Sequence, residues 1–238
     1  MLEIQQKVNF LKDFTSVIKK APIFSGISED ELGSMLVCLD ARTAEYGKGE
    51  YILRVGDRAE AVGLLLSGSA IVAYEDFWGN RNIISRVAPG QTFAEAFACS
   101  PGAALSVGAY AEEPCAVMWL NLARILGTCP TACAHHSRMI RNLLSDLAEK
   151  NLKFSEKLAH MSQRTTREKL MSYLSAEAQR SGSPEFDIPF SRQQLADYLS
   201  VERSAMSTEL GHLRDEGVLR FDKNHFVLLF AKEGGRKR

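Results

Sequence analysis

The chain has 238 residues, of which 45% are hydrophobic and 24% charged. This length suits one or two domains with a buried core, and the composition excludes a disordered, collagen-like or small disulfide-scaffold chain. The 29 basic residues balance the 29 acidic ones, so the net charge permits a nucleic-acid partner without predicting one.

No membrane or secretion signal is visible in the sequence. No apolar run approaches the roughly 18 residues that a bilayer span needs, and residues 1–10 lack the apolar centre of a signal peptide. The five cysteines are an odd number and few for this length, which argues against a disulfide framework. We therefore expect a soluble, cytoplasmic protein that does not bind membranes.

The first 120 residues change from helical to strand-like patterning. Apolar residues at helical spacing predict a short helix over residues 8–20, and Ser28 with Glu31 predicts a capped helix start. From about residue 41, short apolar runs alternate with turn signals such as Gly56-Asp57 and Pro89-Gly90. This spacing predicts a compact antiparallel barrel or roll. After Leu122 the apolar residues return to helical spacing.

Residues 140–161 carry the most regular pattern in the chain. Apolar residues recur there at alternating spacings of four and three, with one polar member, which predicts a helix that pairs with a second copy of itself. The alternative is a core helix packed only on its own domain. We expect Leu143 and Leu152, outside the repeat, to pack back on the barrel. The repeat, here called the seam, consists of Ile140, Leu144, Leu147, Asn151, Phe154, Leu158 and Met161.

After a polar, basic hinge at residues 163–167, the sequence reads as a helix-turn-helix over residues 191–210. Ser191 caps the first helix and Val201 lies in the turn. The second helix directs Ala205, Met206, Leu210 and Leu213 inward and leaves a polar face outward, as in a recognition helix that meets base edges. A hairpin over residues 220–228 follows as a wing that presents Lys223 and His225 to the DNA backbone. The alternative is an ordinary helix pair with solvated polar positions. The predicted base-reading face consists of Arg203, Ser204, Ser207 and Thr208.

The whole chain resembles the Crp/Fnr regulators, most specifically at residues 165–170 and 192–214 and more loosely at residues 47–68 and 89–97. The resemblance implies an α+β chain with three parts. These are an N-terminal double-stranded β-helix or jelly-roll domain of cyclic-nucleotide-binding type (1–134), a long dimerisation helix (135–162) and a C-terminal winged helix-turn-helix (163–238). It also implies that Arg192 and Gln193 contact phosphates.

The sequence departs from the cyclic-nucleotide-binding members of this family. Glu95 stands where such members have a glutamate that takes the ribose hydroxyl, but Ala94 replaces the preceding glycine. Ala103 and Ala104 stand where an arginine would pair with the cyclic phosphate, which argues against cyclic AMP. The region offers an apolar pocket instead, formed by apolar residues between Phe93 and Leu105. Lys150 and Asn151 on the dimer helix are the residues that would sense a ligand there. It is either a filled core or the site of a small apolar, aromatic or acidic effector, and its candidate residues are Glu95, Phe97, Cys99, Ala103, Ala104 and Asn151.

The cysteines suggest a second hypothesis. Cys129 and Cys133, with His135 and His136, bring two thiols and two imidazoles within eight residues, which would suit redox or metal sensing. Residues 1–37 contain no cysteine, so the clustered N-terminal ligands of the iron–sulfur family members are absent. Buried small cysteines are the alternative, and we predict no metal and no cofactor.

We expect a homodimer that binds double-stranded DNA at a pseudo-palindromic operator and regulates bacterial transcription, with RNA polymerase as a further partner. The effector is something other than cyclic AMP, or there is none. A redox- or metal-sensing regulator through Cys129 and Cys133 is the alternative. A small-molecule-binding protein that acts through a protein partner is a different class. No Walker loop, nucleophile elbow, dinucleotide-binding fingerprint or HExxH motif occurs, so the sequence predicts no enzyme.

Overall fold

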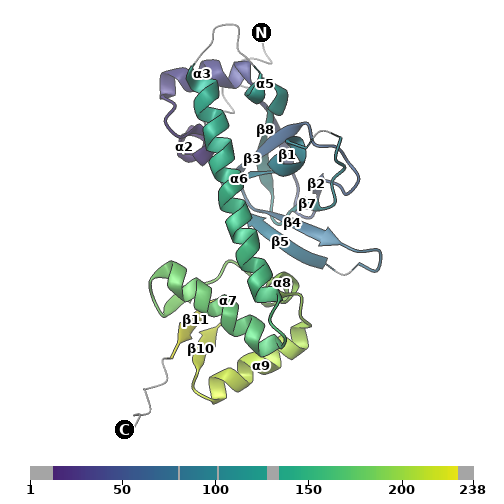
Figure 1. The fold of residues 1–238 in the computed structure, drawn as a ribbon, viewed down its shortest axis with the longest axis vertical. Coiled ribbons are helices and arrows are strands. Elements are labelled where there is room, and N and C mark those ends of the chain that lie inside the picture. The colour runs from purple at the N-terminus through teal and green to yellow at the C-terminus, as the bar shows by residue number, and fades with distance from the viewer. Residues whose placement is uncertain (1–12, 80, 101, 128–133, 230–238) are drawn as a thin grey trace. The chain divides into compact units, whose positions relative to one another are not determined.

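The computed structural model describes residues 13–79, 81–100, 102–127 and 134–229 (Figure 1). They fall into two compact units, Met1–Trp78 with Ile84–Asn151, and Gly79–Ile83 with Leu152–Arg238. None of the described helices is long and apolar enough to cross a membrane. The predicted helix over residues 8–20 is seen as α2 from Thr15 to Lys20, and residues 8–12 lie outside the described part.

The first unit is built on two four-stranded sheets with the orders β1-β8-β3-β6 and β2-β7-β4-β5. Strand β8 pairs with β1 and β3, β3 with β6, and β7 with β2 and β4, all antiparallel, as the alternation of short apolar runs and turns predicted. Its elements are α2 (Thr15–Lys20), η1 (Pro22–Phe24), α3 (Glu29–Cys38), β1 (Arg42–Tyr46), β2 (Tyr51–Leu53), β3 (Ala61–Ser67), β4 (Ala70–Glu75), the later part of β5 (Arg81–Val87), β6 (Thr92–Phe93), α4 (Glu95–Ala98), β7 (Gly108–Ala111), β8 (Cys115–Asn121), α5 (Leu122–Leu126) and the first part of α6 (Ala134–Met161). The start of β5, residues 81–83, belongs to the second unit.

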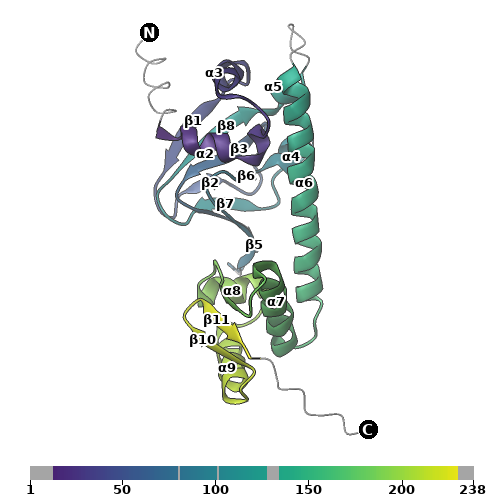
Figure 2. The same ribbon diagram turned by 90° about the vertical axis from the view of Figure 1, so that its left-hand side faces the viewer.

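Strands β3 and β8 are buried on both faces. Leu64 of β3 packs in a first core with α2, α3, α5 and α6, whereas its neighbour Leu65 packs in a second core with residues of β2, β4 and β7. Side chains alternate across a strand, so two apolar faces require the continuous apolar run that the sequence shows here. Met139 and Leu143 of α6 belong to the first core, and Figure 2 shows α6 lying beside α4 of the roll.

Gly63 is a position at which β3 admits no side chain. It pairs with Phe93 of β6, and a Cβ atom at residue 63 would lie 2.5 Å from the Phe93 ring. The ring of Phe93 in turn contacts Trp119 edge-on, with the ring centroids 5.4 Å apart. The position of the short strand β6 therefore depends on direct contact between the Phe93 ring and the backbone of Gly63.

The second unit contains the end of α6, α7 (Thr166–Ser181), β9 (Glu185–Asp187), α8 (Arg192–Leu199), α9 (Arg203–Asp215), β10 (Leu219–Asp222) and β11 (His225–Leu228). Its sheet has the antiparallel order β10-β11-β9. Capping boxes start two of its helices, Thr165 with Glu168 at α7 and Ser191 with Gln194 at α8. The predicted α+β organisation, with a β-roll, a long helix and a winged helix-turn-helix, is confirmed.

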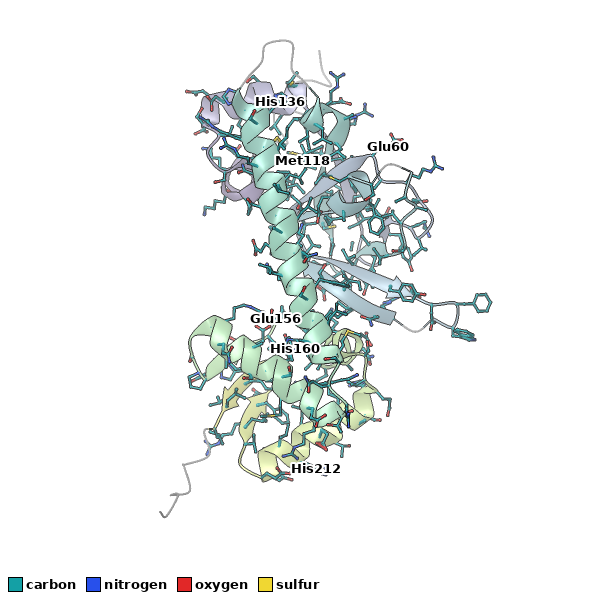
Figure 3. All side chains as sticks on the ribbon, in the orientation of Figure 1. Glu60, Met118, His136, Glu156, His160 and His212 are labelled. Atoms are coloured by element: carbon teal, nitrogen blue, oxygen red, sulfur yellow. The ribbon has the colours of Figure 1, made fainter. Side chains whose placement is uncertain are left out.

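Two polar side chains at the end of α6 are buried in the second unit. His160 hydrogen-bonds through Nδ1 to Ser172 Oγ of α7 at 2.7 Å, and Figure 3 labels it at the end of the helix. Lys157 is only 2% exposed. It donates to Asn82 Oδ1 at 2.8 Å and to the Ile83 carbonyl, and it lies 4.7 Å from the centre of the Tyr198 ring. Burial of this ammonium without a carboxylate partner among these contacts lowers the pKa of Lys157 to about 8.

This lowered pKa predicts a pH dependence of stability. Between pH about 8 and about 10.5, the folded chain has released a proton that the unfolded chain still holds, so the free energy of unfolding rises with pH. The rise is on the order of 3 kcal/mol across this window. We expect Lys157→Met to lose this rise, as measured by denaturant titrations of both chains at the two ends of the window. An identical pH dependence in the two chains would contradict the assignment.

Candidate DNA-reading helix and effector site

Helix α9 presents one polar face and buries the other. Met206, Leu210 and Leu213 are buried, as predicted, whereas Arg203, Ser204, Ser207 and Thr208 are exposed. Ala205, predicted to face inward, is exposed, so the inner face is narrower than predicted. The turn before α9 is made by Ser200, whose φ of 50° lies in the left-handed region. The structure thus brings the four predicted base-reading residues together on one exposed surface.

This surface presents the guanidinium of Arg203 beside the hydroxyl groups of serine and threonine side chains. Within the described part of the chain, Arg203 makes no ion pair or hydrogen bond through its side chain. Ser207 Oγ donates to the Arg203 carbonyl at 2.9 Å, and Thr208 Oγ1 donates to the Ser204 carbonyl at 3.1 Å. Because these hydroxyl protons are engaged by the helix itself, their oxygens remain available chiefly as acceptors. The free guanidinium at the helix N-terminus suits a bidentate contact with guanine.

A groove of about 470 Å³ runs beside the first turn of α9. It is lined by Thr165, Thr166, Arg167, Glu202, Ser204, Ala205, Thr208 and Glu209. Arg167 closes one side through a two-point contact with Glu216, and its donation to that carboxylate lowers the pKa of Glu216. Glu209 lies 3.9 Å from Arg167 and 3.3 Å from His212. The two pairs of Arg167, which the sequence did not predict, join the start of α7 to α9 and to its C-terminal end.

Arg192 packs on the wing. Its guanidinium lies 4.8 Å from the centre of the Phe221 ring and 4.9 Å from that of Phe226. Burial lowers its pKa, and within the described residues one terminal nitrogen is buried without a hydrogen-bond partner. The predicted phosphate-contacting side chain is therefore also a packing element between α8 and the β10–β11 hairpin. Its neighbour Gln193 donates to Asp197 Oδ1 at 2.8 Å.

The wing turns at Lys223, as predicted, with Asp222 opposite His225 in the β10–β11 register. Lys223 is exposed and has a left-handed φ of 50°. His225 lies 3.1 Å from Asp187 and 3.2 Å from Glu185, and its hydrogen bond to Asp187 raises the pKa of the imidazole. A phosphate near this wing would meet the Lys223 ammonium directly, and it would compete with two carboxylates for His225.

The predicted effector residues of the first unit are distributed rather than gathered. Glu95 is buried at the start of α4, where Ala94 adopts the left-handed backbone that glycine usually supplies. Cys99 packs against the first core, whereas Phe97 and Ala103 are half-buried and Ala104 and Asn151 are exposed.

Glu95 is engaged by a lysine of α6. Lys150 Nζ lies 2.9 Å from Glu95 Oε1, and it also contacts Asp146 and Thr92. The sequence singled out Lys150 only as a residue that would sense a ligand. The spacing of Asp146 and Lys150, four residues apart, was the signal that could have indicated an ion pair.

The seam lies on the outer face of α6. Ile140, Leu144, Phe154 and Leu158 are exposed, as is Asn151, while Leu147 and Met161 are half-buried. Leu143 packs back on the roll, as predicted, but Leu152 is 70% exposed and adds to the outer apolar face.

Cys129 and Cys133 lie outside the described residues. Among the described ones, Cys38 Sγ lies 3.7 Å from Nε2 of His136, which Figure 3 labels near the start of α6. No group of three or more His, Cys, Asp or Glu side chains in the described part is placed to hold a metal ion.

An antiparallel β-roll, a long helix and a winged helix-turn-helix define a class of protein in which a sensor-type domain accompanies a DNA-reading domain. Residues 43–130 match the family model of the cyclic nucleotide-binding domain, and residues 168–232 match that of the Crp-like helix-turn-helix domain. Together these models cover more than half of the chain, and the chain belongs to the Crp/Fnr family of DNA-binding transcription regulators. The members of this family are regulators, not enzymes.

Several solved structures share the fold. CLP from Xanthomonas campestris, described as a c-di-GMP responsive global regulator, is 16% identical with a TM-score of 0.67 and covers 84% of this chain and 100% of its own. A CooA mutant from Carboxydothermus hydrogenoformans is 17% identical with a TM-score of 0.63, covering 84% and 88%. FixK2 from Bradyrhizobium japonicum is 22% identical with a TM-score of 0.60, covering 79% and 92%. No curated protein sequence matches the chain.

The stacking of Arg192 predicts that lysine is not a conservative replacement there. Arg192→Lys keeps the charge but loses the planar group that lies on Phe221 and Phe226, so we expect the free energy of unfolding to fall by about 1 kcal/mol. Arg220→Lys, at an exposed position of β10, is the matched control. An unchanged stability with weakened DNA binding would instead assign Arg192 to a phosphate contact alone.

Proposed function

We propose that this chain is a homodimeric transcription regulator that reads a pseudo-palindromic operator with the exposed face of α9. The observation that carries the proposal is the free guanidinium of Arg203 among Ser204, Ser207 and Thr208, on a helix whose other face is buried in the winged domain. Phosphate contacts fix the register of such a domain, and base contacts specify the sequence. Arg192, Gln193, Lys223 and His225 are the proposed backbone contacts.

The homodimer is supported by the outer face of α6. Exposed apolar side chains at heptad spacing would lose their contact with water against an identical helix, and Asn151 would set the register by meeting its own copy. Two recognition helices related by a two-fold axis would then reach half-sites about one helical turn, roughly 34 Å, apart.

The effector, if one exists, is a molecule other than cyclic AMP. Ala103 and Ala104 supply no cation for a cyclic phosphate, and Glu95 is already engaged by Lys150. Activation or repression of transcription would follow from how the bound dimer meets RNA polymerase, which we propose as a partner.

Selection of bound duplexes from a random pool tests the proposal, with and without a small-molecule extract of a bacterial culture. A two-fold symmetric site enriched only with extract supports a ligand-gated regulator, and one enriched equally without it supports effector-free binding. No enrichment at any salt concentration would contradict DNA reading and favour a protein that acts through a protein partner.

Arg203→Ala is expected to weaken binding to the selected site by about 1–3 kcal/mol and to relax the preference at one base pair. The measurement is a titration of the cognate duplex and of duplexes changed at single positions. Arg42→Ala, which removes an exposed arginine of the first unit, is the control for lost charge and should leave the preference intact. An unchanged sequence preference in Arg203→Ala would remove this residue from the reading face.

Leu144→Glu is expected to convert the dimer to a monomer, because it places a charge in the proposed apolar seam at a side chain that is 66% exposed in the single chain. Sedimentation or light scattering measures the mass. Val37→Glu, at an apolar side chain of α3 that is 82% exposed, is the control and should stay dimeric. A Leu144→Glu dimer of undiminished affinity would place the interface elsewhere.

A further inference from the structure

The ammonium of Lys150 occupies a polar site at the junction of β6, α4 and α6 in the first unit. Its Nζ lies 2.8 Å from the Thr92 carbonyl oxygen, 2.7 Å from Thr92 Oγ1, 2.9 Å from Glu95 Oε1 and 2.8 Å from Asp146 Oδ2. An ammonium has three donors, and here four acceptors from three separate elements surround it. The ammonium is therefore held by protein acceptors on several sides, although the side chain as a whole is 34% exposed.

Two of the three residues that supply these acceptors are among the most buried polar residues of the unit. Glu95 is 5% and Thr92 4% exposed, and both are packed under α6. Two carboxylates share one ammonium, so the cluster carries more negative than positive charge. The second oxygen of Glu95, Oε2, is buried without a hydrogen-bond partner among the described residues. Removal of Lys150 would leave the buried carboxylate of Glu95 and the half-buried carboxylate of Asp146 without this cation, which is a costly arrangement.

The cluster also joins the roll to the helix that carries the seam. Asp146 and Lys150 lie one turn apart on α6, and seam residue Leu147 lies between them. Thr92 begins β6 and Glu95 begins α4, on either side of the corner at which Ala94 adopts a left-handed backbone. The ion pair between Glu95 and Lys150 therefore fixes the β6–α4 corner against the first part of the proposed dimer helix.

We propose that Lys150 is a built-in ligand, whose ammonium takes the place of an effector and holds the sensor domain in its DNA-binding arrangement without any small molecule. The inference rests on the proposed function, and of its two versions it favours a regulator that needs no small-molecule effector. The chain itself supplies the hydrogen-bond donor for the buried glutamate, so the coupling between the roll and the seam is permanent.

Chemical rescue tests the site without reference to DNA. Lys150→Ala removes three methylenes and the ammonium, which n-propylammonium replaces atom for atom. We expect a lowered thermal unfolding midpoint that n-propylammonium raises again in a saturable manner, whereas 1-propanol, its neutral counterpart, does not. Lys150→Met fills the space without charge, so it should be destabilised but not rescued. Lys48→Ala, at an exposed lysine between β1 and β2, is the control and should resemble the parent chain.

The second readout is DNA affinity for the site selected without extract. We expect Lys150→Ala to bind about tenfold more weakly, a typical coupling between sites, and n-propylammonium to restore the affinity while leaving the parent chain unaffected. Parent-like midpoint and affinity in both Lys150→Ala and Lys150→Met would overturn the proposal, as would a rescue by 1-propanol equal to that by the amine. A parent chain that binds no duplex would instead overturn the proposed function, and the midpoint experiment would still report on the ammonium site.

Discussion

The structure depends on a helix that must serve two apolar surfaces at once. Met139 and Leu143 of α6 are fully buried in the first core, whereas Ile140 and Leu144, each one residue further along, are exposed. Successive residues of a helix point about 100° apart, so anchoring the inner pair fixes the direction of the outer pair. The packing of the roll thereby orients the face that a second chain would meet. The cluster of Thr92, Glu95, Asp146 and Lys150 reinforces this orientation one to two turns further along the helix.

Local periodicity made much of the fold predictable. The capping box at Ser28, the helix cap at Ser191, the alternation of strands and turns, the helix-turn-helix and the wing turn at Lys223 are all encoded within a few residues of sequence, and all are present. The errors at Ala205 and Leu152 have one cause. Periodicity gives the centre of a buried face but not its width, which depends on how closely the neighbouring element approaches.

The contacts that define the candidate sites were less predictable because they join distant parts of the chain. Lys150 meets Thr92 across 58 residues of sequence, and the stack of Arg192 on Phe226 requires the wing to fold back on α8. The apolar run around Phe93, Phe97 and Cys99 resembled a single pocket in sequence. In the structure Phe93 belongs to the second core and Cys99 packs against the first. Which side of a sheet a residue reaches depends on strand pairing, and composition does not carry that information.

The contact between Gly63 and Phe93 restricts how this sequence can diverge. A Cβ atom at residue 63 would overlap a ring that is itself held against Trp119, so a side chain at residue 63 requires the ring or β6 to move. Thr92, the neighbour of Phe93, supplies two of the acceptors around Lys150. A substitution of Gly63 that displaces Phe93 would therefore also displace Thr92 and disturb the charged cluster around Lys150. Descendants of this chain that alter residue 63 should carry a smaller side chain at residue 93, so the two positions form one inherited unit.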